Sequence, residues 1–403
     1  MDERTLLKEI KDAVSTEEII ALTRKLISIP SHWDVPSLEQ EVVEELVRFC
    51  RVHELDYELQ PVDDKRSNII VKLPGTGNGN SLALNGHLDT VPPYNMTVEP
   101  FAANMEGNRI YGRGAVDMKG PVAAMLSTIL AFKRSGIKLK GDLVFTGVLA
   151  EETNSDGSET LISSGFKTDG AIVGEPSNHE YAIGHRGLEW LEVEIIGKSA
   201  HGGIPDAGIN AIVNAARFIL RVQEKVVPRL KGLDHPFMGP SVMNFGRIEG
   251  GTQPSTVADR CIIQIDRRYI PSESLQEVLR EYEDILEELS KEYPGFKGVM
   301  RRMPSSLMKK FDHVPMETSP DHPLVSAVKD SIELITGAQP KMTTRRGWTD
   351  AAILNYYGKI PTVVYGPGDI SRSHTPGEYI TVEELIDGFK AYSLIAMKFC
   401  GLA

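Results

Sequence analysis

Residues 112–153 read GRGAVDMKGPVAAMLSTILAFKRSGIKLKGDLVFTGVLAEET, and this stretch decides the fold class of the chain. Its first half has helical periodicity, with five apolar residues on one side of a predicted helix: Val122, Met125, Leu126, Ile129 and Phe132. Residues 143–149 form a short, mostly apolar run that is typical of a buried strand. Further short strands are predicted at residues 68–73, 82–84 and 171–173. Because strands alternate with helices, the sequence predicts a layered α/β domain.

The middle of the chain has a different order of predicted elements. Residues 187–304 run strand, helix, strand, strand, helix, strand, and the helix over residues 274–293 is strongly amphipathic. The order βαββαβ is that of the ferredoxin-like unit. After a polar stretch the α/β pattern resumes. The sequence therefore predicts one discontinuous domain, residues 1–186 and 305–403, with a second domain inserted at residues 187–304.

The composition excludes several classes of protein. The chain has 403 residues, and 44 Lys and Arg against 56 Asp and Glu give a net charge of −12, which argues against a nucleic-acid surface. No apolar run approaches the ~18 residues of a membrane span. The charged N-terminus has no apolar signal-peptide core, and the three separated cysteines are expected to be reduced thiols. We therefore expect a cytoplasmic protein without nucleic-acid or membrane partners.

Five short segments place His or carboxylate residues at the ends of predicted strands or in the turns that follow. They are NGHLDTVPP (His87, Asp89), GRGAVDMKG (Asp117), LAEET (Glu151, Glu152), VGEPS (Glu175) and RSHTPGE (His374). In α/β sheets, ligands bind beyond the carboxyl ends of the strands. Acidic groups gathered there without Lys or Arg would repel one another unless a cation neutralised them. His nitrogen and carboxylate oxygen favour Zn2+ or a similar divalent metal.

Each of these residues has an ordinary alternative when it is taken alone. Asp117 could cap the helix that follows it, Glu175 could belong to a simple turn, and His374 could be a loop histidine. The conjunction of five segments favours the metal site. Within a strand, the spacing of His87 and Asp89 places both side chains on one face, so Asp89 could orient a ligating imidazole. No HExxH, GxSxG or phosphate-loop motif competes with this interpretation.

Together with GKSAHGG around His201, these motifs resemble those of the M20 metallopeptidase and amidohydrolase family. That family includes acetylornithine deacetylases, succinyl-diaminopimelate desuccinylases, aminoacylases and carboxypeptidases. The resemblance extends from residue 16 to the C-terminus. It implies a zinc-binding catalytic domain, with a mixed sheet flanked by helices, and an inserted ferredoxin-like lid that forms a homodimer through residues 187–304. The pattern of predicted elements indicates the same layout independently.

The resemblance also implies two divalent metal ions, Zn2+ or alternatively Co2+. One would be held by His87, Asp117 and Glu175, and the other by Asp117, Glu152 and His374. Glu151 would be the general base that acts on metal-bound hydroxide, and Asp89 the partner of His87. A cis peptide bond is expected between Asp117 and Met118.

Outside the metal site, the resemblance assigns residues to the substrate. His201 would reach the active site of the partner subunit, whereas Arg186 and Arg268 would bind a substrate carboxylate and Gly347 would line the substrate pocket. Two features depart from the family pattern. Ser255 stands where many members have Asn, and the segment RRGW, residues 345–348, replaces a glycine-rich one. These departures argue against the transfer of any single substrate.

The function expected from the sequence is metal-dependent hydrolysis of the amide bond of a small N-acyl amino acid or related acylamine. A dipeptidase or carboxypeptidase with the same metals is the closest alternative. A metal-binding protein without catalytic activity is a third class, against which the presence of Glu151 argues, since a pure binder has no need of a base beside the ligands.

Overall fold

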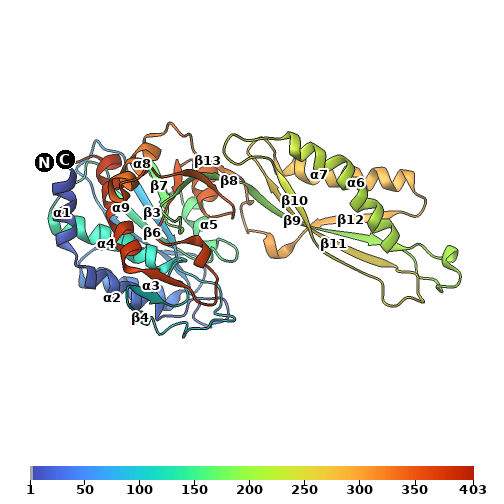
Figure 1. The fold of residues 1–403 in the computed structure, drawn as a ribbon, viewed down its shortest axis with the longest axis horizontal. Helices are drawn as coiled ribbons and strands as arrows, with labels where there is room; N and C mark the ends of the chain where they lie inside the picture. Colours follow the sequence, from blue (N-terminus) through green and yellow to red (C-terminus); the bar gives the residue numbers. More distant parts are fainter. Residues whose placement is uncertain (1–2) are drawn as a thin grey trace.

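We describe residues 3–403 of the protein in a computed structural model. The chain folds into two lobes (Figure 1). One lobe contains the first and the last described residues and a nine-stranded sheet, and the other contains a four-stranded sheet with two helices. We call them the catalytic lobe and the inserted lobe. The hydrophobic core of the inserted lobe is a separate cluster, built on Leu191, Val193 and Ile195.

The central sheet of the catalytic lobe is mixed. In sheet order its strands are β1 (Asp56–Pro61), β2 (Ser67–Leu73), β6 (Leu143–Val148), β3 (Leu82–His87), β7 (Gly170–Val173), β15 (Thr362–Val364), β8 (Tyr181–His185) and β13 (Met316–Glu317), with β14 (Met342–Arg345) also paired to β8. The neighbours β6, β3, β7 and β15 run parallel, whereas β1, β2 and β13 pair antiparallel with their neighbours. Every residue of β3, β6 and β7 is buried, as expected for parallel strands covered on both faces.

Helices flank this sheet, as the sequence predicts. They are α1 (Glu3–Ala13), α2 (Thr16–Ile27), α3 (Gln40–Val52), α4 (Lys119–Ser135), α5 (Asp156–Ser163), α8 (Pro323–Thr336) and α9 (Val382–Cys400). Capping boxes begin two of them, with Ser15 and Glu18 at α2 and Thr381 and Glu384 at α9. Residues 119–132 of α4 are all buried, because α4 packs against α1, α2 and α9 as well as the sheet.

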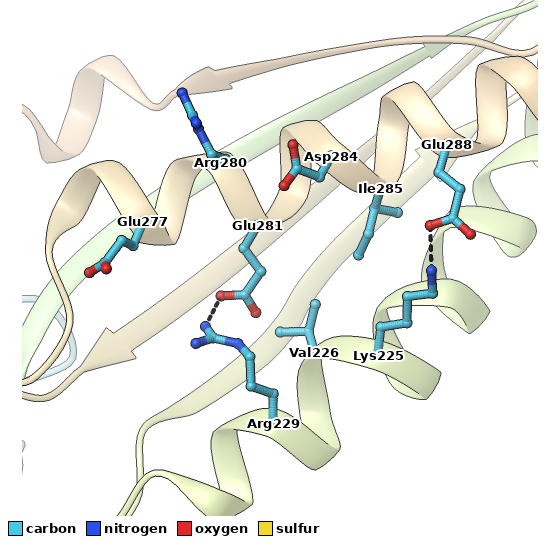
Figure 2. A pocket seen from close by; sticks show the side chains of 9 residues that line it. All are labelled: Lys225, Val226, Arg229, Glu277, Arg280, Glu281, Asp284, Ile285 and Glu288. Carbon is cyan, nitrogen blue, oxygen red and sulfur yellow. Dashed lines mark hydrogen bonds and ion pairs between the residues drawn. The ribbon is translucent and has the colours of Figure 1, made fainter.

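The inserted lobe has the order βαββαβ. Its elements are β9 (Gly187–Ile196), α6 (Ala211–Gly232), β10 (Val242–Gly250), β11 (Arg260–Tyr269), α7 (Leu275–Glu292) and β12 (Lys297–Arg302). The strand order is β10-β11-β9-β12, with antiparallel neighbours throughout. Residues of β9 and β11 alternate between buried and partly exposed, and the buried side packs against α6 and α7. Ion pairs between Lys225 and Glu288 and between Arg229 and Glu281 join the two helices (Figure 2).

Short elements complete the fold. A three-stranded sheet joins β4 (Met105–Glu106), β5 (Arg109–Tyr111) and β16 (Tyr379–Thr381). The short helices are η1 (Pro205–Ala207), η2 (Pro304–Ser306), η3 (Ile353–Tyr357) and η4 (Ile370–Arg372). The pairing of β16 with β5 brings the segment after η4 beside the loop that leads into α4. This contact matters because the two segments carry His374 and Asp117.

Residues 74–80 join β2 and β3 without forming a hairpin of paired strands, because β6 lies between those two strands in the sheet. Residues 351–357 are helical, and Ile353–Tyr357 among them form the π-helical turn η3. In the described part of the chain, the search for a helix both long and apolar enough to cross a membrane finds none.

Candidate metal centre and substrate pocket

Three neighbouring parallel strands, β6, β3 and β7, end at the same edge of the central sheet. β3 ends at His87, whose register partner is Val148, the last residue of β6. β7 ends at Val173, whose register partner is Asn85 of β3. The loops that follow the three strands carry four acidic residues past this edge: Asp89, Glu151, Glu152 and Glu175. The sheet topology alone therefore gathers most of the predicted site.

Asp117 reaches the same place from the loop before α4. The peptide bond between Asp117 and Met118 is cis, which confirms the prediction from the family resemblance. The fully buried Glu378 holds this loop, because its Oε1 accepts the backbone N–H groups of Val116, at 2.9 Å, and Asp117, at 3.2 Å. Arg113 forms a buried ion pair with the other carboxylate oxygen of Glu378. The position of Asp117 thus depends on contacts to a segment more than two hundred residues away.

Three groups of donor atoms lie close together, and within each the donor atoms lie within 4.8 Å of one another. One joins His87 to Glu151 and Glu152. The other two share the carboxylate of Asp117: one consists of His87, Asp117 and Glu175, and the other of Asp117, Glu152 and His374. His87 Nε2 lies 3.1 Å from Asp117 Oδ1 and 3.7 Å from Glu175 Oε1. His374 Nε2 lies 3.4 Å from Asp117 Oδ2 and 2.8 Å from Glu152 Oε1. The structure therefore brings together all five residues that the sequence analysis assigns to the metals.

These groups suit divalent cations chemically. Each offers one imidazole nitrogen and two carboxylates, a donor set that fits Zn2+ and its neighbours. Glu175 Oε1 is buried and has no hydrogen-bond partner among the described residues. An unpartnered buried carboxylate oxygen is energetically unfavourable unless something else compensates it, and a cation would do so.

The electrostatics of the site also favour a bound cation. Desolvation and the neighbouring charge of Glu175 raise the pKa of Glu151 well above its usual range. Burial also raises the pKa of Glu152, to about 7, and that of Glu175. Hydrogen bonds to Asp117 and Glu152 raise the pKa of His374 to about 10. Glu151, Glu152 and Glu175 therefore favour their neutral forms, and a divalent cation would reverse that preference. The pKa of Asp117 is instead held below its usual range by hydrogen bonds with His374 and His87.

Asp89 connects the two sides of the site. Its carboxylate accepts the backbone N–H groups of Glu151, at 3.1 Å, and Glu152, at 2.9 Å. Its Oδ1 lies 3.4 Å from Nδ1 of His87, which is 3.0 Å from the Asp89 carbonyl oxygen. From the sequence, Asp89 is expected only as the partner of His87. The structure adds that Asp89 also holds the turn that carries Glu151 and Glu152.

A cavity of about 580 Å³ opens beside the donor groups. Acidic residues of the site form one part of its wall, including Glu151. Another part comes from β14 and the segment after it, with Arg345, Arg346, Gly347 and Trp348. The Trp348 indole N–H donates to the carbonyl oxygen of Val314 at 3.0 Å, so the ring is held in place. The segment that departs from the family pattern thus lines the cavity, Gly347 included.

Arg345 makes a contact that the sequence analysis did not anticipate. Its Nη2 donates to Glu175 Oε2 at 2.5 Å and its Nη1 to the carbonyl oxygen of Pro176 at 2.9 Å. Sequence patterns carry no signal for this pair, because the two residues are 170 positions apart.

Asp350 is a second residue that sequence reasoning missed. It is buried, and its Oδ2 accepts the Ser158 hydroxyl at 2.6 Å. Burial raises the pKa of Asp350 to about 6, and its charge is one of the causes that raise the pKa of Glu151. The only sequence signal was its position directly after the RRGWT segment.

Three residues assigned to the substrate lie elsewhere. His201 is exposed on the inserted lobe, with its Nδ1 accepting the Gly203 N–H at 3.0 Å. Arg268 forms a bidentate pair with Asp266, at 2.7 and 3.1 Å, and Arg186 donates to the carbonyl oxygen of Met238. Among residues 3–403 these three side chains are not part of the cavity wall. The chain by itself therefore does not bring them to the donor groups.

Residues 83–398 match the model of peptidase family M20/M25/M40. This match covers most of the chain and includes every residue of the two donor groups, so the protein belongs to this family. It is accordingly a hydrolase of amide or peptide bonds.

Individual relatives and structures agree with this assignment. The chain is 30% identical over 341 residues to acetylornithine deacetylase of Myxococcus xanthus, covering 84% of this chain and 85% of the relative. It is 28% identical over 413 residues to N-formyl-4-amino-5-aminomethyl-2-methylpyrimidine deformylase of Halalkalibacterium halodurans, covering 96% and 95%. In structure it resembles the Bacillus subtilis YXEP protein, described as a dinuclear metal binding peptidase of the M20 family. The TM-score is 0.70, with 19% identity and coverage of 94% of this chain and 97% of that one.

Proposed function

We propose that the protein is a deacylase, which hydrolyses the amide bond of a small N-acyl amino acid or related acylamine with the help of two divalent metal ions. The two relatives named above are a deacetylase and a deformylase, and both names describe removal of an acyl group. The observation that carries the proposal is the pair of donor groups that share Asp117, since four of their five residues (Asp117, Glu152, Glu175 and His374) line the same cavity as Glu151.

Zn2+ is the metal that these residues suit best, with Co2+ as the alternative. His87, Asp117 and Glu175 would hold one ion, and Asp117, Glu152 and His374 the other. When bound, the ions would polarise the scissile carbonyl and lower the pKa of water. The structurally similar YXEP protein is itself a dinuclear metal binding peptidase.

The residues of the chain have separate tasks in this proposal. Glu151 accepts the proton of the attacking water and then donates it to the leaving amine. Asp89 accepts the backbone N–H groups of Glu151 and Glu152 and lies beside His87, so it fixes the position of the base relative to two of the ligands. Glu378 does the same for Asp117 through two backbone N–H groups. Arg346, which lines the cavity, is suited to bind a carboxylate of the substrate.

We also propose a homodimer formed through residues 187–304, in which His201 serves the active site of the partner subunit. Two features of the inserted lobe support this. β10 is an edge strand of its sheet, and it exposes Val242 and Ile248. The outer side of α6 exposes three further apolar side chains: Ile212, Val213 and Leu220.

A peptidase is the second candidate, favoured by the name of the matching family. The two functions share the bond class and the metals, and they differ in what the cavity accepts. Purified protein supplied with Zn2+ or Co2+ should be assayed on N-acetylornithine, N-succinyl-diaminopimelate and a panel of dipeptides. Turnover of acylated amino acids well above that of dipeptides supports the deacylase, and the reverse order supports the peptidase. Metal binding without turnover on any of them would contradict both.

A further inference from the structure

The two donor groups differ in how their carboxylates are held. In the group of His87, Asp117 and Glu175, an arginine occupies one oxygen of Glu175. In the other group, Glu152 contacts His374, and the described residues include no Lys or Arg paired with it. This asymmetry centres on Arg345.

Arg345 is fixed at both ends of its guanidinium group. Its Nη2 donates to Glu175 Oε2 and its Nη1 to the carbonyl oxygen of Pro176, the next residue in the chain. The side chain is 14% exposed and that of Glu175 is 3% exposed, so the pair is shielded from solvent. A planar guanidinium that spans a carboxylate and the adjacent carbonyl restricts the rotation of that carboxylate.

The other oxygen of Glu175 points into the donor group. Oε1 lies 3.7 Å from His87 Nε2 and has no hydrogen-bond partner among the described residues. The restraint on Oε2 therefore determines where Oε1 is. Without Arg345, rotation of the carboxylate would exchange or displace the two oxygens.

We propose that Arg345 is a positioning residue for the metal site, which holds Glu175 by one oxygen so that the other oxygen alone serves as a ligand. The inference rests on the proposed metal-dependent function and adds to it an unequal dependence of the two ions on one arginine. Whether loss of Arg345 raises or lowers metal affinity depends on two opposing effects. The positive charge of Arg345 repels a cation, but loss of the partner that orients a ligand typically lowers metal affinity ~10–100-fold. The orienting effect is therefore the larger one.

The test is metal binding, measured on metal-free protein by titration with Zn2+ in a competing chelator. R345Q should weaken one of two Zn2+ sites ~10–100-fold and leave the other unchanged. The matched control is R346Q, which removes the same charge from the same cavity wall, since the described residues give Arg346 no hydrogen bond or ion pair. R346Q should leave both sites within about twofold. R345K keeps the charge but not the fork, so its loss should be smaller than that of R345Q.

The variant E175Q decides whether Arg345 acts through Glu175. In that background R345Q should cause little further loss, because the restrained ligand is already altered. Equal weakening of both sites by R345Q, no weakening, or full loss again in the E175Q background would each overturn the inference. Protein that binds no metal at all would instead overturn the proposed function. If R345Q does not fold, as judged by its thermal unfolding, R345K in the two backgrounds provides the same comparison.

Discussion

The predicted functional residues of the catalytic lobe come together at one site, whereas those of the inserted lobe do not. In the catalytic lobe, residues from five separate segments form two donor groups that share Asp117, and within each group the donor atoms lie within 4.8 Å of one another. In the inserted lobe, Arg268 pairs with Asp266, and His201 accepts an N–H from its own loop. The residues of the catalytic lobe surround one common site, whereas His201 and Arg268 bond to neighbours within their own loop or strand.

The difference follows from how each set is supported. Parallel strands of one sheet end at one edge, so residues after β3, β6 and β7 must meet there whatever else the protein does. The chain passes between that sheet and the inserted lobe twice, before β9 and after β12, and the loop after α6 contacts the sheet through His235 with Glu317 and Phe237 with Thr344. At this junction Arg302 pairs with Glu189 and Asp312, both at 2.8 Å. A residue such as His201 can therefore serve a site only if the lobes move or a second subunit supplies it.

The largest effect is expected in the catalytic lobe, from Glu151→Gln. The variant keeps the shape of the side chain but cannot accept a proton, so kcat should fall about 10²–10⁴-fold. Metal stoichiometry, measured by atomic emission on the dialysed protein, should stay the same as in the wild type. Unchanged turnover, or loss of metal together with turnover, would contradict the role of Glu151 as the base.

The residues of the donor groups and Glu151 were predictable as a cluster because each lies in a short motif at or just after a strand end, whereas their division into ligands and base came from the family resemblance. The partners of these residues were not. Glu378 contacts a residue 261 positions away and Arg345 one 170 positions away, and a single sequence has no periodicity that links such distant residues. The same limit applies to the fold. β2 and β3 are neighbours in the sequence, but β6 separates them in the sheet, and only the tertiary arrangement decides that order. β14 was missed because its four residues, MTTR, are all partly exposed and show no alternation.

The next largest effect tests the inserted lobe. In the proposed dimer, His201 would donate a hydrogen bond to the oxyanion that develops in the partner subunit's active site. Removing one such donor typically lowers kcat by about 10²–10³-fold, and we expect this loss for His201→Ala. If His201 serves the partner subunit, mixing this variant with Glu151→Gln protein should restore activity. Heterodimers would contain one intact site, so equal mixing should give about one quarter of the wild-type activity. Activity that stays at the level of the separate variants would show that each subunit is complete by itself or that His201 has another role.

A smaller effect is expected from Asp89→Asn. The amide cannot accept both backbone N–H groups of the turn that carries Glu151 and Glu152, and it weakens the contact with His87. Metal affinity should fall ~10–100-fold, the usual loss when the partner of a ligating histidine is altered. Zn2+ titration measures this, and Asp266→Asn on the inserted lobe is the matched control. Equal loss in both variants would mean that the lobes are not independent.

The smallest effect concerns Arg268 and decides whether the inserted lobe also binds substrate. If Arg268 binds a substrate carboxylate, Arg268→Gln should raise KM ~10-fold with little change in kcat, because the contact exists before and during the reaction. The pair with Asp266 offers an internal control, since a partly exposed ion pair within one strand contributes little to stability. Asp266→Asn frees the guanidinium group and should leave KM unchanged or lower it. An equal rise of KM in both variants would show that the pair only maintains the lobe, and the contrast between the two lobes would then be one of function as well as of structure.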